Sequence, residues 1–177
     1  MKKLMITTLA LLLAMSLFAG TAMAAHSPEK LLSAIHSLAE EGGVLNCDFQ
    51  VGDCTIEDIR ESLGKPDKSN YVASAQGTYE TFDNHAIVAG VGKGDLVFEL
   101  RSFSKRLHVI SEHAVTEYFG DHDHIAHEGG QTMVSYVLNH DYHLKFVFNG
   151  DGYLDHYNVI YLAGSGNSMA GEHDRNW

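Results

Sequence analysis

The sequence predicts an α+β fold in which two tandem helix-plus-three-strand repeats form one antiparallel sheet with helices on one face. Three observations support this prediction. Two short amphipathic helices begin after the hydroxyl residues Thr55 and Ser111 and end at Gly64 and Gly120. Equivalent positions of these two helices lie 56 residues apart. Each helix precedes three strand-like stretches, so the repeats cover about 55–103 and 111–162. Chance similarity between short amphipathic pieces is the alternative.

Residues 1–24 have the features of a signal peptide. Lys2 and Lys3 precede an apolar stretch, and Ala22-Met23-Ala24 supplies a small-x-small cleavage site. We expect a mature chain that begins at Ala25 and is secreted, extracellular or associated with the cell envelope. An uncleaved membrane anchor is the alternative, because the apolar stretch is nearly long enough to span a bilayer.

The charge balance excludes two classes of partner. The 177 residues contain 12 Lys+Arg against 23 Asp+Glu, a formal net charge of −11. Nucleic acids and anionic membranes are bound through clustered cations, so neither is an expected partner.

The segment 25–54 precedes the repeats and is expected to be continuous with the domain 55–177. Ser27 and Pro28 mark the start of a helix whose apolar stripe ends at Gly42-Gly43. A short extended segment, 44–51, follows. Cys47 and Cys54, separated by six intervening residues, predict a local disulfide in an oxidising compartment. Two buried free thiols, or a redox or metal pair, are the alternatives.

Strand-like patterns fill the remainder of each repeat. In the first repeat they cover residues 71–82, 86–91 and 96–103, and Gly92-Lys93-Gly94-Asp95 predicts a hairpin turn between the last two. In the second repeat they cover 132–138, 142–148 and 153–162. The glycine-rich stretch 90–94 joins two strands and does not open a helix, so a phosphate-binding role is not expected. Gly164-Ser165-Gly166 is expected to be a loop and not a nucleophile elbow.

Several stretches resemble a known family. The segment Tyr153–Tyr161, followed by Met169-Ala170-Gly171 and Trp177, is similar to the terminal signature of the YjgB-like family, secreted bacterial proteins without an assigned function. The likeness extends over residues 31–41, 46–49, 64–68 and 97–102. More distantly, the tandem repeats and the Leu63–Pro66 turn resemble the beta-lactamase-inhibitor-like fold. Both resemblances imply partner binding, and neither implies catalytic residues or a cofactor.

A histidine-rich segment, residues 121–128, is expected to be a loop after the second helix. His122, His124 and His127 lie there among carboxylates, a combination suited to zinc or another divalent transition metal. A solvated acidic loop with adventitious metal affinity is the competing interpretation. Asp155 and His156 are not expected to pair, because neighbours in a strand point to opposite faces.

Aromatic residues suggest a binding surface on the sheet. We expect Phe98, Phe103, Phe146 and Phe148 to pack under the helices, and Tyr71, Tyr79, Tyr136 and Tyr153 to be available for partner contact. The sequence therefore predicts a secreted, non-enzymatic binding or inhibitor-like module that contacts a protein or cell-envelope component through its sheet face. The alternative is an extracellular divalent-metal-binding protein that uses the histidine-rich segment. A hydrolase of wall polymers would need a carboxylate pair that sequence alone cannot reveal.

Overall fold

The computed structural model describes residues 27–164, and the predicted signal peptide and the segment after Gly164 lie outside this range. Its α-helices are α3 (Pro28–Glu40), α4 (Ile56–Leu63) and α5 (Glu112–Phe119). Its strands are β1 (Lys68–Val72), β2 (Gly77–Phe82), β3 (Ile87–Val91), β4 (Val97–Ser102), β5 (His124–Glu128), β6 (Gln131–Val137), β7 (Tyr142–Phe148) and β8 (Leu154–Tyr161). Short 3-10 helices are η1 (Asp83–His85), η2 (Lys93–Asp95) and η3 (Lys105–Val109).

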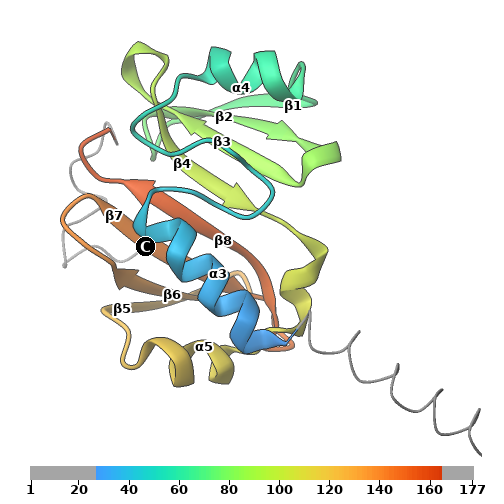
Figure 1. Cartoon of the computed structure of the whole chain (residues 1–177), viewed down its shortest axis with the longest axis vertical. Helices are drawn as coiled ribbons and strands as arrows, with labels where there is room; N and C mark the ends of the chain where they lie inside the picture. Colours follow the sequence, from blue (N-terminus) through green and yellow to red (C-terminus); the bar gives the residue numbers. More distant parts are fainter. Residues whose placement is uncertain (1–26, 165–177) are drawn as a thin grey trace, which may run out of the picture.

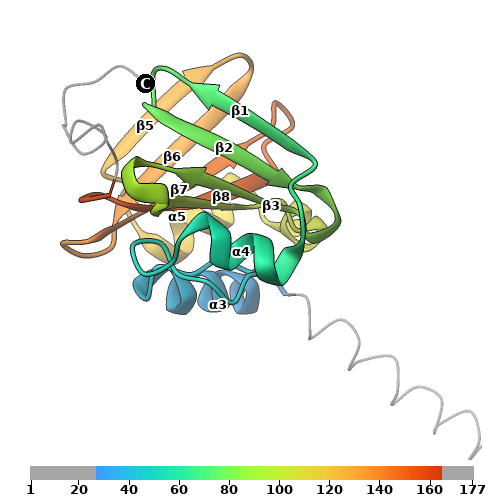
Figure 2. The same ribbon diagram turned by 90° about the horizontal axis from the view of Figure 1, so that it is seen from above.

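All eight strands form one antiparallel sheet in the order β1-β2-β3-β4-β8-β7-β6-β5. The helices α3, α4 and α5 cover one face of this sheet (Figures 1 and 2). In the described part of the chain no helix lies on the opposite face, which we call the open face. The outer strand pairs β1–β2 and β5–β6 curl away from the helices, so the open face is concave (Figure 2). The predicted α+β class, antiparallel sheet and one-sided helices are confirmed.

Each helix begins at a residue that the sequence indicated. Ser27 accepts a hydrogen bond from the Lys30 amide at the start of α3. Thr55 forms a capping box with Asp58 at the start of α4, and Ser111 accepts from the Ala114 amide at the start of α5. Gly64 and Gly120 end the last two helices with positive φ values of 87° and 81°. A side chain is strained in that conformation, which explains glycine at both ends.

The prediction of three strands after each helix is wrong, because four strands follow each one. The stretch 71–82 divides into β1 and β2 at a turn where Gln76 adopts a φ of 51°. The histidine-rich segment 121–128 was expected to be a loop, but its second half is the edge strand β5. An edge strand forms backbone hydrogen bonds with one neighbouring strand and stays largely exposed to water. Its side chains therefore need not alternate between apolar and polar, and its sequence can look like that of a loop.

Strands β4 and β8 join the two sets of four strands at the centre of the sheet. Leu100 lies opposite Val159, and Ser102 lies opposite Tyr157. The turns before these two strands also correspond, since Thr55 bridges to Leu96 and Ser111 bridges to Tyr153. Each helix start is therefore tied to the strand that reaches the centre of the sheet. The predicted hairpin turn between β3 and β4 is confirmed, with η2 at its tip.

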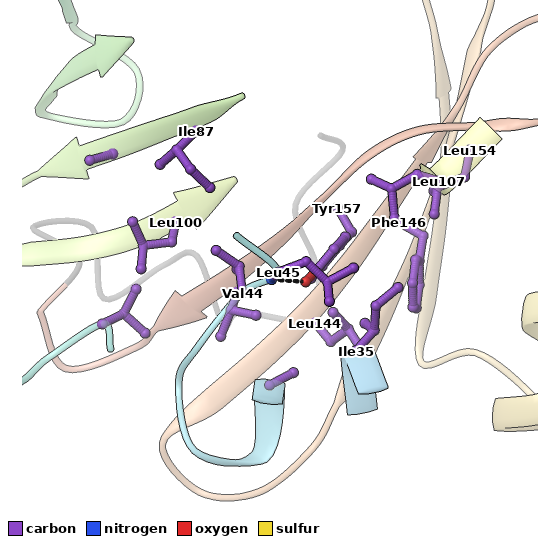
Figure 3. Close-up of a cluster of buried hydrophobic side chains, with 14 of the residues drawn as sticks. Ile35, Val44, Leu45, Ile87, Leu100, Leu107, Leu144, Phe146, Leu154 and Tyr157 are labelled. Carbon is purple, nitrogen blue, oxygen red and sulfur yellow. Dashed lines mark hydrogen bonds between the residues drawn. The ribbon is translucent and has the colours of Figure 1, made fainter. Parts of the chain in front are cut away.

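The hydrophobic core lies between the helices and the sheet (Figure 3). Ile35 of α3 packs there with Leu144 and Phe146 of β7, and all three are fully buried. Tyr157 is also fully buried, and its hydroxyl oxygen accepts a 2.6 Å hydrogen bond from the Leu45 amide. The segment 44–51 is irregular and not extended as expected, with a single bridge between Gly43 and Gln50. The Tyr157 bond fixes this segment to the sheet, which satisfies a buried polar pair.

Candidate functional site

A row of side chains crosses the open face, one from each strand. The strand register places Lys68, Thr81, Val88 and Arg101 opposite one another in turn, and then continues through Asn158, Lys145, Ser135 and His124. We call these eight residues the open-face row. Paired residues of neighbouring strands point to the same face, so the row is continuous. It contains three cationic residues and no carboxylate.

Glu99 anchors a polar network at the centre of the open face. Its carboxylate accepts hydrogen bonds from the Tyr79 hydroxyl at 2.6 Å, from Arg101 Nε at 2.8 Å and from Asn158 Nδ2 at 2.7 Å. The guanidinium carbon of Arg101 lies 4.5 Å from the centre of the Tyr79 ring. Glu99 and Asn158 are each only 4% exposed although no helix of the described chain covers them. The network therefore buries the Glu99 carboxylate beside the half-buried side chain of Arg101.

The electrostatics of this network keep Glu99 and Arg101 ionised. Burial alone would raise the pKa of Glu99, but the charge and hydrogen bond of Arg101, with the Tyr79 hydroxyl, bring it below the usual value. Burial opposes the charge on Arg101, but Glu99 raises the pKa of Arg101. Burial lowers the pKa of Lys145, and the nearby charge of Glu99 partly offsets that effect. Arg101 and Lys145 therefore both act on the Glu99 carboxylate.

Two buried polar atoms of the open-face row have no hydrogen-bond partner in the described structure. They are Asn158 Oδ1 and His124 Nε2. Because Asn158 donates to Glu99 through Nδ2, its oxygen is left as an unused acceptor beside Arg101 and Lys145 in the row. A buried polar atom without a partner is costly, and an ordered water, an ion or a ligand can supply the missing hydrogen bond.

An apolar strip runs along one side of the row. Phe103 stacks on His156 with ring centroids 4.4 Å apart, and Val147 and Met133 follow on the neighbouring strands. The prediction that Phe98 and Phe103 pack under the helices is wrong. Phe98 contacts Tyr79 on the open face, where an irregular register displaces it from the alternation of β4. Phe146 and Phe148 do lie in the core.

Asp155 and His156 form a pair that the sequence interpretation rejected. Asp155 Oδ2 lies 2.8 Å from His156 Nδ1. A register shift where β7 meets β8 interrupts the strict alternation of faces, so neighbouring side chains can meet there. Burial lowers the pKa of His156 more than the Asp155 hydrogen bond raises it. At neutral pH this imidazole is uncharged.

The four tyrosines expected at the partner surface lie in different places. Tyr79 is on the open face, with its hydroxyl bound to Glu99. Tyr71 is 68% exposed, but it pairs with Thr78 on the helix side of the edge strand. Tyr136 is buried against Phe119 and Phe146, and burial raises its pKa to about 12. Tyr153 is exposed in the turn before β8. Tyr136 is therefore not available for contact, because the period-2 alternation turns it toward the core.

The histidine-rich segment does not gather its imidazoles. His124 faces the open side of β5 beside Ser135, whereas His127 pairs with Thr132 on the other side and lies 3.1 Å from its hydroxyl. His122 precedes the strand and is exposed. Within residues 27–164, no three His, Cys, Asp or Glu side chains are placed to hold a metal ion. A strand sends residues three apart to opposite faces, whereas a helical turn would have placed His124 and His127 on one face.

The two cysteines are free thiols in the structure, so the expected disulfide is not present. Cys54 is buried, and burial together with the neighbouring Cys47 and acidic residues raises its pKa to about 12. Burial also raises the pKa of Cys47. Neither thiol is therefore activated as a nucleophile.

The central residues of the open face were missed at the sequence level. Glu99, Arg101, Lys145 and Asn158 lie within strands whose apolar residues dominated the interpretation. The alternation of charged with apolar residues in Val97–Ser102 was the available signal, since a charge in a central strand needs a partner. The identity of those partners depended on a strand order that the sequence did not supply.

Comparison with known proteins places the chain in a family. Residues 32–160 match the model of a domain of unknown function, DUF4309. The chain belongs to the DUF4309 family. The crystal structure of YjgB, a DUF4309 protein from Bacillus subtilis, is similar to it with a TM-score of 0.60 and 16% sequence identity, over 75% of this chain and 97% of that one. The predicted resemblance to the YjgB-like family is confirmed.

A second structure shares less with the chain. An extracellular protein containing an SCP domain from Bacillus anthracis aligns with a TM-score of 0.45 and 13% identity, over 64% of this chain and 46% of that one. No curated protein matches the sequence. None of the helices within residues 27–164 combines the length and hydrophobicity needed to cross a membrane.

Proposed function

We propose that this DUF4309 protein is an exported, non-enzymatic binding module whose ligand site is the open face of its sheet. The partner is a protein or a component of the cell envelope. The signal-like sequence of residues 1–24 supports export. The inhibitor-like role inferred from the beta-lactamase-inhibitor-like fold is one form of the same proposal, because such a module also acts by covering a partner.

One observation carries the proposal, namely the burial of charged and polar side chains on a sheet face that has no helix over it. A sheet face that only meets water gains nothing by burying a carboxylate and an amide beside a half-buried guanidinium and a half-buried lysine, since these groups lose hydration there. Such groups are retained where they orient a ligand. Glu99 holds Tyr79, Arg101 and Asn158 in fixed positions by accepting one hydrogen bond from each. This rigidity reduces the entropy lost on binding.

We also infer that the two helix-plus-four-strand halves are tandem copies of one unit. The capped starts at Thr55 and Ser111, the positive-φ glycines at Gly64 and Gly120, and the matching bridges to Leu96 and Tyr153 all favour this relation. The open face then lies across the junction of two similar units, where ligand sites often occur.

Divalent-metal binding by His122, His124 and His127 has no structural observation in its favour. The alternation of β5 separates His124 from His127, so metal affinity at this segment is expected to be that of isolated surface histidines. Zinc titration of the purified mature protein measures this directly.

Retention of partners on immobilised protein tests the open-face proposal. The mature chain is exposed to solubilised envelope and secreted proteins of the producing cell, beside the variants Val137→Asp and Val109→Asp. Val137 borders the open face and Val109 lies in η3, with exposures of 45% and 47%. A ligand on the open face loses contact only with the first variant.

We expect Val137→Asp to retain about tenfold less partner than the wild type and Val109→Asp to match the wild type. Equal retention by all three proteins, or no retention by any, contradicts the proposal. Circular dichroism of each variant separates loss of binding from loss of folding.

A further inference from the structure

The two edge strands of the sheet differ in how they resist the approach of another strand. β1 begins with the exposed Lys68, and a lysine on an edge strand disfavours pairing. β5 contains neither lysine nor proline, and its Ile125 is 38% exposed. Since β5 and β6 curl away from the helices, the free edge of β5 points away from the helix layer (Figure 2). β5 is therefore the edge that another strand can join.

The turn after β5 fixes which of its backbone groups are free. Glu128 pairs with Gln131 across a two-glycine turn whose φ values are 59° and 82°. Two positive φ values define a type I′ hairpin turn, whose flanking residues form a hydrogen-bonded pair. Such pairs alternate along an antiparallel ladder, so every second residue of β5 directs its N–H and C=O groups to β6. The remaining two, Ile125 and His127, direct theirs away from the sheet.

From these free groups and the side-chain pattern of the strand, we infer that two copies of this chain associate by pairing their β5 strands antiparallel about a two-fold axis at Ala126. The inference concerns a different surface from the open-face proposal and stands apart from it. Ile125 of each copy forms a hydrogen-bonded pair with His127 of the second copy. Both strands therefore use the backbone groups that β6 leaves free.

The axis at Ala126 is the register that pairs the whole strand. An axis between two residues would place outward groups opposite inward groups, so the ladder could not form. An axis at Ile125 or at His127 keeps the hydrogen-bonding pattern but overlaps only part of each β5. The axis at the central residue overlaps the strand from His124 to Glu128. The small side chain of Ala126 also allows close approach where this residue meets its own equivalent.

Side chains of opposite character meet in this register. His124 lies opposite Glu128 of the second copy, and the two-fold symmetry repeats this pair on the other side of the axis. Both residues lie on the open face, because they are four positions apart in one strand. His124 Nε2 has no hydrogen-bond partner in the described structure, and a carboxylate is an acceptor for an imidazole N–H. Such cross-strand pairs stabilise an antiparallel ladder.

The other face of β5 adds an apolar contact. The exposed Ile125 lies opposite the His127 ring of the second copy and is covered on association. The same construction on β1 would place Lys68 opposite Val72, which brings no complementary charge. The side-chain pattern therefore favours self-pairing at β5 over self-pairing at β1.

Sedimentation equilibrium of the mature chain and five variants tests the inference. Ile125→Pro removes an outward N–H and leaves the β5–β6 ladder intact. Glu128→Lys places a cation opposite His124, and adding His124→Glu restores opposite charges in exchanged positions. Glu117→Lys makes the same charge change at an exposed site of α5, and Tyr71→Lys alters the β1 edge. Circular dichroism of each variant separates loss of association from loss of folding.

The interface is one strand wide, so we expect a weak dimer with a dissociation constant on the order of 10 μM. Ile125→Pro should stay monomeric, and Glu128→Lys should weaken association about tenfold. The exchanged double variant should return to within about threefold of the wild type, and Glu117→Lys and Tyr71→Lys should match it.

A wild-type chain that stays monomeric up to about 1 mM overturns the inference. Dimers of a folded Ile125→Pro variant, or equal association by Glu128→Lys and Glu117→Lys, also overturn it. Failure of the exchanged double variant to recover removes the proposed register, and loss of the dimer in Tyr71→Lys assigns association to the opposite edge.

Discussion

The two faces of the sheet bury side chains for different reasons. The helix-covered face encloses apolar residues such as Ile35, Leu144 and Phe146, and its buried carboxylate, Glu80, forms an ion pair with Arg60 of α4. The open face encloses the polar side chains Glu99, Asn158 and His156, and Asn158 Oδ1 has no hydrogen-bond partner in the described structure. The first arrangement stabilises the fold, whereas the second holds polar groups on the open face at a cost in stability.

Removing bulk from the helix-covered face should have the largest effect on stability. Phe146→Ala empties a fully buried site among Phe119, Tyr136 and Tyr157. We expect a loss of about 3–5 kcal/mol in the free energy of unfolding, measured by denaturant titration. Met133→Ala on the open face is the control and should cost about 1 kcal/mol or less, since that residue is only half-buried. Similar losses at both sites would remove the distinction between the faces.

Breaking the charge pair of the open face should have the next largest effect. Arg101→Met removes the cation that is hydrogen-bonded to the buried Glu99 carboxylate and should cost about 1.5–3 kcal/mol. Adding Glu99→Gln to the same chain should recover part of that loss, because the uncompensated charge disappears. Denaturant titration of the single and double variants measures the coupling. If the two losses simply add, the pair is not held as a desolvated unit.

Acidification should produce the smallest effect, through His156. Burial lowers its pKa in the folded protein, so the unfolded chain, whose histidines titrate near about 6.5, takes up this proton first. Its contribution to stability is therefore complete above that pH and is lost as the pH falls below it. Asp155, Arg101 and Glu99 are the charges that act on it.

We expect His156→Gln to lose less unfolding free energy than the wild type between about pH 7 and about pH 5. The exposed His113 of α5 provides the matched control, and His113→Gln should follow the wild type. A wild-type pH dependence in His156→Gln would show that this imidazole titrates alike in both states.

The helices and most strands could be predicted because caps, terminal glycines and hydrophobic period are set by residues within or next to each element. Ser27, Thr55 and Ser111 cap the starts of helices through hydrogen bonds to residues three positions away. Gly64 and Gly120 end two of these helices with a positive φ, which glycine adopts without strain. Strand β5 was missed because its pairing uses backbone groups, which every sequence carries. The Asp155–His156 contact was missed because it depends on a register shift between two strands.

The sequence by itself determined the α+β class, the starts of the helices and the acidic character of the chain, since these follow from side-chain period and composition. Only the tertiary structure decided which polar residues meet. Arg101 and Asn158, 57 positions apart, become neighbours because β4 pairs with β8, and Lys145 joins them because β7 pairs with β8. Strand order and register are long-range choices made by the packing of the whole core, so the site that they create has no local signature.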